Sequence, residues 1–265
     1  VRFTFWTPAD ASVDFVEEPI PVEITAYDRA EFQSDGRGTI QQVTFFGKVE
    51  ALWKAESPRE QVLRRFFGNK LVVDLEKDEA GAHKIRHVSL QDDKVLFESI
   101  HVLNEKKVNH VALTCRQFDY DAAGSKITAT GPGRMELNNQ KVPPVSQPTR
   151  QFSLQKPCFA YMEGFDQLVW NVAVNTVLAY GKDSIYLNYW PFEQGRLGDQ
   201  VVVQCVHAQA QFALPSRGKS ELVSLQASGG VSYREQKERG HYMEGNSLVY
   251  QQSDEWLVIE GTDNY

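Results

Sequence analysis

The segment Phe118–Gly131, with the sequence FDYDAAGSKITATG, shows how this chain builds its structure. Apolar and polar side chains alternate at its start, turn-forming residues fill its middle, and the alternation resumes over Ile127–Ala129. Alternation with a period of two is typical of a strand with one buried face, because successive side chains point to opposite sides of a sheet. We therefore predict a β-hairpin: one strand ends near Tyr120, a polar turn follows, and a second strand ends at Gly131, where glycine permits a bulge or bend.

The same alternation recurs along most of the chain. The alternating runs are rich in Val, Ile, Phe, Tyr and Trp, which favour pleated sheets, and pairs such as Asp35-Gly36 supply turns between them. We predict an all-β fold of repeated antiparallel strands. The clearest runs are Val43–Phe45, Val49–Trp53, Val111–Cys115, Leu168–Val174, Val201–Cys205 and Leu257–Ile259.

Three sequence matches indicate internal repeats. Val43–Val49 and Leu225–Val231 share, without gaps, the pattern apolar, any, apolar, any, Gly, any, Val. Downstream of them, Gly68–Val73 matches Gly245–Tyr250, and the hairpin described first is matched by Leu248–Gly261. Strand repeats of this kind form a stack in which each unit buries its apolar face against its neighbours. The alternative is that all-β sequences resemble one another through composition alone.

Composition is that of an ordinary globular protein. The 265 residues are enough to bury a sizeable core, and 42% are hydrophobic and 24% charged. The net charge of −7 argues against a nucleic-acid partner, which would require a basic stripe. No apolar run reaches the roughly 18 residues that a membrane helix needs. The chain opens with the alternation Val1, Phe3, Phe5 and shows no targeting segment, so we expect that a signal or anchor was removed.

One segment interrupts the β pattern. Residues 141–148 hold three prolines within six positions, which cannot belong to a central strand. They divide the chain into residues 1–140 and 149–265, two halves of similar β-repeat character, and we favour a loop that crosses one continuous sheet over a linker. Two short helices are also predicted: Ser57–Phe67, which opens with a Ser-Pro pair, and Asp10–Phe15.

No residue pattern points to catalysis or to a metal. His83 and His87 are four residues apart, but their surroundings are strand-like, and we predict solvated side chains. We predict the same for His101 and His110, which flank a turn. Arg217–Ser220 ends like a phosphate-binding loop but lacks the upstream glycine. We therefore predict that the protein is not an enzyme and uses no cofactor and no metal.

The three cysteines do not define a disulfide framework. An odd number leaves at least one of Cys115, Cys158 and Cys205 outside any disulfide within the chain. We favour three small buried side chains, because free cysteine is among the most buried residue types. One structural disulfide remains the alternative.

The repeated elements resemble the OstA/LptA-type β-repeat of lipopolysaccharide-transport proteins. Phe45–Val49 is similar to the Gly-x-Val element of that family, and Phe118–Asp121 with Ile127–Gly131 is similar to its second and third elements. Leu222–Gly261 contains all three in order. The likeness covers about half the chain. Its motifs are short, and their ordered repetition is what supports the resemblance.

The resemblance implies an open, twisted β-jelly roll, folded like a V or a taco, whose apolar concave face holds acyl chains. It also implies a periplasmic, cell-envelope location. The implied partners are an amphiphilic lipid such as lipopolysaccharide and other OstA-like modules, joined edge to edge by β-augmentation. The chain departs from the family in an insertion at Ser57–Phe67, in the aromatic stretch Tyr186–Phe192 and in its acidity. These departures bear on the cargo more than on the fold.

Together with this resemblance, the alternation predicts which side chains face inward and contact lipid. A closed core would alternate in the same way, so for each residue that alternative stays open. Trp190–Phe192 and Trp256 are expected at exposed edges or seams instead. The predicted lipid-binding residues are Phe45, Val49, Trp53, Leu71, Phe118, Tyr120, Ile127, Leu168, Trp170, Val172, Tyr233, Leu248, Tyr250 and Ile259.

The function we predict from the sequence is a non-enzymatic lipid-transport or bridging module of the cell envelope. One alternative is a structural or adaptor β-scaffold with the same fold and no lipid cargo. Another is a carbohydrate-binding or hydrolytic jelly roll, which would need exposed Trp or Tyr platforms and a pair of carboxylates. A wide apolar groove open to solvent would favour the lipid module over the scaffold.

Overall fold

The computed structural model describes residues 1–7, 20–77, 83–140, 157–193, 196–212, 222–251 and 256–261. These residues form fifteen strands and no helix, which confirms the predicted all-β class. The strands are β1 (Arg2–Thr7), β2 (Ile20–Thr25), β3 (Arg29–Ser34), β4 (Ile40–Glu56), β5 (Glu60–Lys77), β6 (His83–Leu103), β7 (Lys106–Asp121), β8 (Lys126–Asn139), β9 (Cys158–Asn171), β10 (Thr176–Glu193), β11 (Arg196–Leu197), β12 (Gln200–Phe212), β13 (Leu222–Gln236), β14 (Tyr242–Gln251) and β15 (Trp256–Glu260).

All fifteen strands belong to one antiparallel sheet, which is not closed into a barrel. Its order is β1-β2-β4-β5-β6-β7-β8-β9-β10-β12-β13-β14-β15, while β3 pairs with β4 and β11 with β10. β8 and β9 pair over almost their full length, so the sheet continues from the first half of the chain into the second. The proline-rich residues 141–148 between them lie outside the described residues, as does the predicted helix Asp10–Phe15.

The pairings between long strands, from β4/β5 to β13/β14, change register near the middle of the strands. Between β4 and β5 the shift separates the pair Phe46↔Lys70 from the pair Val49↔Gly68. The shifts in the other pairings follow one another across the sheet. A β-bulge bends the strand that carries it, so a continuous row of bulges bends the whole sheet. We call this row the crease.

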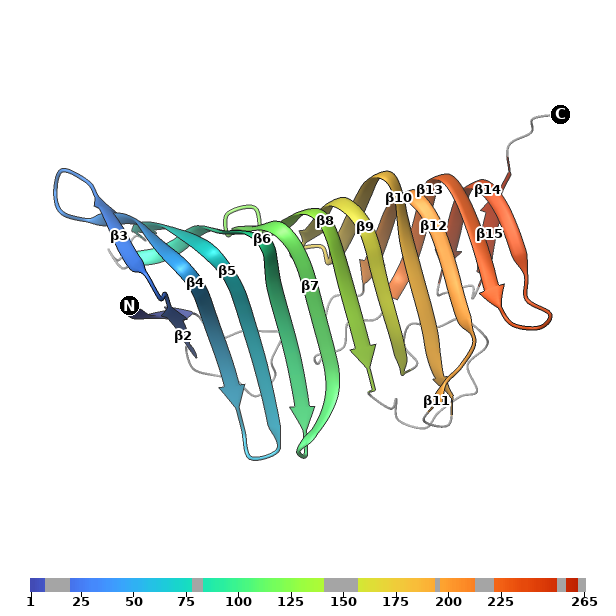
Figure 1. Ribbon diagram of the computed structural model, residues 1–265, viewed down its shortest axis with the longest axis horizontal. Coiled ribbons are helices and arrows are strands. Elements are labelled where there is room, and N and C mark those ends of the chain that lie inside the picture. Colours follow the sequence, from blue (N-terminus) through green and yellow to red (C-terminus); the bar gives the residue numbers. More distant parts are fainter. Residues whose placement is uncertain are drawn as a thin grey trace.

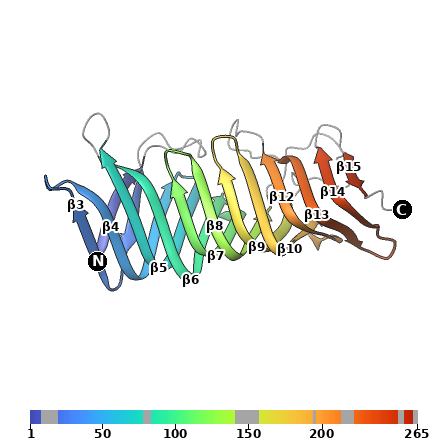
Figure 2. The ribbon, with the colours of Figure 1, turned by 90° about the horizontal axis from the view of Figure 1, so that it is seen from above.

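The crease divides the sheet into two walls. Wall A contains the half-strands from residues 40–46 of β4 to 247–251 of β14, together with β3 and β15. Wall B contains those from residues 49–56 of β4 to 242–245 of β14, together with β1 and β2. Figure 1 shows the strands arching from one wall to the other, and Figure 2 shows the two layers of half-strands crossing. This architecture agrees with the predicted open, twisted, V-shaped jelly roll.

The predicted strand end at Gly131 is wrong. β8 continues through Gly131 to Asn139, and the glycine lies at the crease. Gly47 in β4 and Gly229 in β13 also lie there, with φ of +75° and +87°. Glycine adopts these left-handed angles without the steric cost of a Cβ atom, so it bends the strand without ending it. The strands are therefore longer than the sequence pattern indicates.

The predicted helix Ser57–Phe67 is also wrong. β5 begins at Glu60, and Ser57 opens the tight turn that joins β4 to β5. The Glu60 backbone N–H donates to Ser57 Oγ at 3.1 Å, and the Ser57 N–H donates to the Glu60 carbonyl at 2.7 Å. Serine before proline suits a β-turn as well as a helix start, because in both the hydroxyl oxygen satisfies a backbone N–H. The segment lengthens the β4–β5 hairpin.

Gly164 provides a test of the crease. Its φ is +84°, and a Cβ atom there would lie 2.5 Å from the Ser184 carbonyl oxygen. We expect Gly164→Ala to lower the free energy of unfolding by more than about 2 kcal/mol, because backbone strain and a backbone clash add. The control Gly230→Ala has a φ of +77° with no atom within 4 Å, so strain alone acts, at about 1–2 kcal/mol. Urea unfolding followed by circular dichroism measures both, and equal losses would contradict a role for the close approach at the crease.

Candidate functional site

Wall A presents two rows of apolar side chains to the inside of the fold. Within each row, every residue is the cross-strand partner of the next, from β3 to β15. Row 1, nearer the crease, contains Ala30, Phe45, Leu71, Leu90, Phe118, Ala129, Leu168, Ala179, Ala208, Ala227, Leu248 and Ile259. Row 2, nearer the rim, contains Phe32, Val43, Val73, Val88, Tyr120, Ile127, Trp170, Val177, Ala210, Leu225, Tyr250 and Leu257.

Wall B contributes a third such row and the floor of the interior. The floor is a line of fully or almost fully buried side chains beside the crease. Row 3 contains Phe3, Ile24, Ala51, Phe66, Phe97, Leu113, Met135, Met162, Leu187, Val203, Tyr233 and Met243. The floor contains Val49, Val95, Cys115, Phe165, Ile185, Cys205 and Val231.

Glycines interrupt the line of floor residues at three positions, Gly68, Gly133 and Gly245. A Cβ atom on Gly68 would lie 2.8 Å from Cδ1 of Leu90 in wall A, and one on Gly245 would lie 2.6 Å from Cγ2 of Ile259. A Cβ atom on Gly133 would overlap the ring of Phe165. At Gly68 and Gly245 the two walls therefore approach each other so closely that there is no room for a side chain, and at Gly133 the neighbouring Phe165 ring fills the space.

Aromatic contacts join the two walls in the N-terminal half of the interior. The Phe118 ring of wall A lies 5.2 Å from Phe66 and 6.1 Å from Phe97 of wall B, measured between centroids. At the N-terminal end, the Phe3 ring of wall B lies 5.2 Å from Phe45 of wall A. Aromatic pairs of this kind contribute about 0.5–1.5 kcal/mol each beyond burial, so this half is packed as a core.

The C-terminal half is lined by smaller side chains on wall A. From β8 to β13, row 1 has alanine at four of its five positions: Ala129, Ala179, Ala208 and Ala227, interrupted by Leu168. Two of the residues that wall B contributes there, Met135 and Met162, are unbranched and adapt to irregular space. Less side-chain volume therefore fills this half than the phenylalanine-rich half.

Charged side chains collect toward the rim of wall B. Arg64 faces inward there, with its guanidinium 4.6 Å from the Trp53 ring, and His101 contacts Glu60. Glu235 lies on the same side near the C-terminal end. Partial burial raises the pKa of its carboxyl, but hydrogen bonds from Lys237, His241 and Tyr233 outweigh this and hold the pKa at about 2. The interior is thus apolar at its floor and charged at one rim.

The structure places thirteen of the fourteen predicted residues on the inner face. Val172 is the exception. It lies in the turn after β9 and is 41% exposed, so the predicted inward position is wrong. Row 1 contains six of them: Phe45, Leu71, Phe118, Leu168, Leu248 and Ile259. Row 2 contains Tyr120, Ile127, Trp170 and Tyr250, row 3 contains Tyr233, and the floor contains Val49. Trp53 packs near the rim of wall B with Ile20, Ala55 and Val62.

Several inner residues escaped sequence analysis. Phe66 was missed because a helix was predicted for its segment. Phe97 and Phe165 were missed because the alternation changes phase near them, at the crease. Allowing alternation to change phase at each glycine or bulge is the signal that would have identified them. Trp190 was expected at an edge or seam; it pairs with Phe159 of β9 and lies one residue beyond Tyr189↔Val201, the last pair between β10 and β12. Trp256 begins the edge strand β15.

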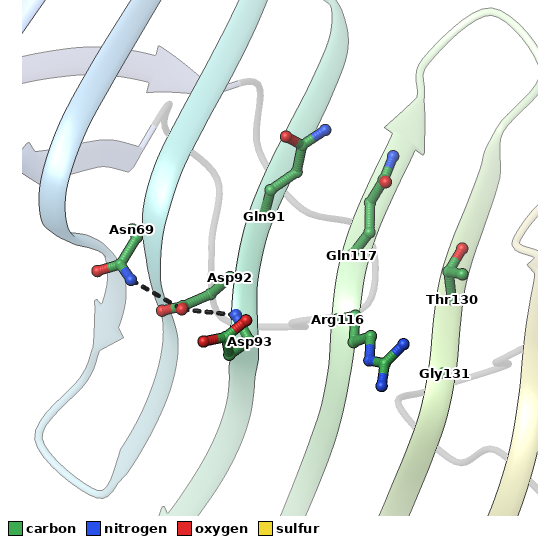
Figure 3. A pocket seen from close by; sticks show the side chains of 8 residues that line it. All are labelled: Asn69, Gln91, Asp92, Asp93, Arg116, Gln117, Thr130 and Gly131. Atoms are coloured by element: carbon green, nitrogen blue, oxygen red, sulfur yellow. Dashed lines mark hydrogen bonds between the residues drawn. The ribbon is translucent and has the colours of Figure 1, made fainter.

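The outer face carries a polar depression near the crease, lined by Asn69, Gln91, Asp92, Asp93, Arg116, Gln117, Thr130 and Gly131 (Figure 3). The Asn69 amide donates to Asp92 Oδ1 at 2.8 Å, so these groups partly satisfy one another. In the part of the chain that the structure describes, no cluster of three or more His, Cys, Asp or Glu side chains could hold a metal ion. None of the described segments forms a helix that could span a membrane.

The predicted solvation of His101 and His110 is wrong. Both side chains are partly buried, His101 against Glu60 and His110 with its Nε2 atom 3.3 Å from Glu98 Oε1. His87 lies on the outer face between two carboxylates, 3.4 Å from Asp74 and 3.7 Å from Asp119. The side chain of His83 lies outside the described residues.

These features define the protein by its architecture: one open antiparallel sheet, folded along a crease around an apolar interior. No protein-family model and no curated protein matches the chain. Among solved structures, it is similar to LptH from Pseudomonas aeruginosa, described as the LptA homologous periplasmic component of the conserved lipopolysaccharide transport device. The two chains are 13% identical, the match covers 62% of this chain and 84% of that chain, and the TM-score is 0.35. A likeness of this extent carries no functional argument.

The burial and the pKa values of the three cysteines indicate that the interior excludes water. All three are free and buried, as predicted. Burial raises the pKa of the Cys115 thiol to about 12 and those of Cys158 and Cys205 to about 11. At about pH 9, a thiol with a pKa near 11 is roughly 1% ionised, whereas an exposed thiol is more than half ionised. We expect iodoacetamide to label the folded protein at least about 30-fold more slowly than the urea-unfolded protein, measured by mass spectrometry.

The same shifts give a pH dependence of stability. The thiols of the unfolded chain ionise above about pH 8.5–9, while the buried thiols of the folded chain stay protonated. The contribution of these three thiols to the free energy of unfolding is therefore complete below that pH and is lost as the pH rises toward their folded-state pKa values. In the iodoacetamide experiment, rapid labelling of a chain that keeps its native circular dichroism spectrum would show that water reaches the cysteines and would contradict a dry interior.

Proposed function

We propose that the protein is a non-enzymatic transport or bridging module of the cell envelope, which holds the acyl chains of a lipopolysaccharide-type lipid between its two walls. The observation that carries this proposal is the continuity of rows 1, 2 and 3, which contain only apolar and aromatic residues across twelve strands. At about 4.8 Å between neighbouring strands, each row extends for roughly 50 Å. A continuous apolar surface of that length suits extended hydrocarbon chains.

Burial of hydrocarbon drives binding in this proposal, at about 0.8 kcal/mol for each CH₂ group removed from water. A chain enters when the walls separate at their rims. The backbone hydrogen bonds run between neighbouring strands within each wall, so this separation costs side-chain contacts and leaves the ladders intact. The crease then acts as the hinge, and the cargo replaces the apolar contacts that the walls lose.

The alanine-rich C-terminal half is the part of the interior that we assign to the cargo. Ala179, Ala208 and Ala227 are buried in row 1 and leave wall A with little side-chain volume to displace. In the other half, separation of Phe118 from Phe66 and Phe97 would lose one edge-to-face and one stacked aromatic contact. The lower cost of separation favours entry between β8 and β14.

The rim of wall B offers cations for an anionic headgroup. Arg64 faces inward beside Trp53. Arg59 lies in the β4–β5 turn, next to the β6–β7 turn, because the Asn104 N–H donates to the Arg59 carbonyl at 2.8 Å. Lys106 and Lys107 follow that second turn. Because the whole chain is acidic, recognition of an anion depends on such local groups.

Other modules of the same architecture are the protein partners that we propose, and a periplasmic location follows from this function. Both ends of the interior leave apolar row members uncovered: Phe32 is 49% exposed in β3 and Met243 is 36% exposed in β14. Among the described residues, 242–246 of β14 have a strand on one side only. Such free edges accept another strand by β-augmentation, which would extend the interior from one module into the next.

The packed N-terminal half favours a second candidate, a structural or adaptor scaffold without lipid cargo. There the interior is filled by the protein's own rings, among them Phe66, Phe97 and Phe118. If the C-terminal half is equally closed to ligands, the same fold serves as a rigid spacer. Lipid titration separates the two functions.

Ala179→Trp tests the proposed cargo space. Ala179 is buried in row 1, and its neighbour Leu178 is exposed on the outer face of the same strand. We expect Ala179→Trp to weaken binding of lipid A or lipopolysaccharide by about tenfold or more, because the indole fills the space of an acyl chain. Leu178→Trp is the matched control and should bind like the unmodified protein. Native mass spectrometry and fluorescent-lipid displacement measure the affinities.

If Ala179→Trp does not fold, Ala208→Met places a smaller side chain in the same row and should show a smaller loss. Circular dichroism confirms the fold of each variant before titration. The proposal is overturned if the unmodified protein shows no saturable lipid binding, or if a folded Ala179→Trp protein binds lipid as tightly as the control.

Met243→Lys tests the proposed end-to-end partnership. A lysine pointing inward at the open end should hinder addition of another module, because its charge would be buried at the junction. We expect self-association, followed by sedimentation velocity over a range of concentrations, to need about tenfold more protein than without the substitution. Leu178→Lys, on the outer face away from the ends, controls for added charge. A monomer at all concentrations without substitution would contradict self-stacking.

A further inference from the structure

Three aromatic rings form a cluster on the outer face of wall B. Ala160, Met162 and Tyr189 face the interior, so Phe159, Tyr161 and Trp190 face outward. Their ring centroids lie 5.5 Å apart for Phe159–Trp190, 5.6 Å for Tyr161–Trp190 and 6.2 Å for Phe159–Tyr161. Trp190 is inclined to the other two rings by only 37° and 35°. We call this cluster, on the neighbouring strands β9 and β10 (Figure 1), the aromatic platform.

Polar groups surround the aromatic platform. The Arg134 guanidinium lies over the Tyr161 ring, 4.2 Å from its centroid, and is paired with Glu136 at 2.7 Å and Glu163 at 3.2 Å. On the other side, Asn188 is the cross-strand partner of Tyr161, and its Oδ1 atom accepts a hydrogen bond from Gln200 Nε2 at 2.8 Å. Apolar rings thus lie beside fixed hydrogen-bonding groups of the amide, guanidinium and carboxylate types.

The aromatic surface continues along the outer face of β10. Tyr186 and Tyr180 are both exposed and lie on this face, on either side of the crease. Two aromatic rings elsewhere on the outer face are covered by cations: Arg29 lies 4.1 Å from the centroid of Phe46, and Arg65 lies 5.6 Å from that of Phe67. In the described contacts of the platform, a cation covers Tyr161 alone, while Phe159 and Trp190 contact other rings.

We propose that the aromatic platform binds a neutral β-1,4-linked glycan. The equatorial substituents of such sugars leave flat C–H faces that stack on aromatic rings, and their hydroxyls form hydrogen bonds with amide and charged side chains at the ring edges. Tyr186 lies four residues before Trp190 on the same face of β10, about 13 Å away, within reach of an oligosaccharide that stacks on Trp190. This site lies outside the interior and is independent of lipid binding.

Charge distinguishes a glycan from a membrane surface as the occupant. Glu136 and Glu163 border the platform on either side of Arg134, so these three groups keep one net negative charge, and the whole chain carries a net charge of −7. Anionic lipid headgroups would be repelled by these carboxylates, whereas membrane-surface binding usually combines aromatic residues with lysine and arginine. A neutral sugar has no such penalty and can use the carboxylates as hydrogen-bond acceptors.

Calorimetric titration with cellohexaose and with chitohexaose tests the site, with maltohexaose as an α-linked comparison. We expect the folded protein to bind at least one β-1,4-linked hexasaccharide more tightly than maltohexaose. Trp190→Ala should weaken that binding by about tenfold or more, as removal of a central aromatic anchor does. The matched control Tyr242→Ala removes an exposed tyrosine from the same wall, four strands from Tyr161 in the same cross-strand row, and should not change it.

Tyr161→Phe keeps the fold in case Trp190→Ala does not, and it should weaken binding through the loss of one hydroxyl at the ring edge. The proposal is overturned if neither hexasaccharide binds, or if a folded Trp190→Ala protein binds as tightly as the Tyr242→Ala control. Binding of phosphatidylglycerol vesicles that depends on Trp190, without oligosaccharide binding, would also overturn it and identify the platform as a membrane contact.

Discussion

The alignment of the bulges is the constraint on which the rest of the structure depends. A single bulge would bend one strand and leave its neighbours straight, which would break the ladder. Because the shifts occur in every pairing from β4/β5 to β13/β14, the bend is shared and the hydrogen-bonded ladder resumes on both sides. Only then do the inner faces of the two halves of each strand meet, and a single sheet acquires an interior that would otherwise require two.

The sequence predicts the faces of the strands well, because alternation between turns depends only on which side of a half-strand is buried. Phe45, Phe118 and Leu248 were identified in this way. Val172 was placed wrongly, since the alternation from Leu168 continues into the turn, where Trp170 Nε1 donates to Asn175 Oδ1 at 3.2 Å. Local alternation contains no signal for where pairing ends.

The contacts between the walls could not be predicted from the sequence. Phe66 and Phe118 meet only because the crease returns one wall toward the other. In β5 the alternation changes phase at the crease, because Leu71 and Phe66 both face inward although they are five residues apart, so one uninterrupted period assigns half of β5 to the wrong face. The alanines of row 1 have no local signature either, and the difference between the two halves of the interior emerges only when the register aligns them.

The meander order of the sheet has a consequence for how the protein folds and unfolds. Apart from the short β3 and β11, each strand pairs with the strands that precede and follow it along the chain. Each hairpin is therefore stabilised mainly by the hairpins on either side. Stability in such linear arrays is a sum of unit and nearest-neighbour terms. Ends can therefore fray while the middle stays intact, and folding can start from any well-packed hairpin. The array can also gain or lose hairpins at an end without rebuilding what remains.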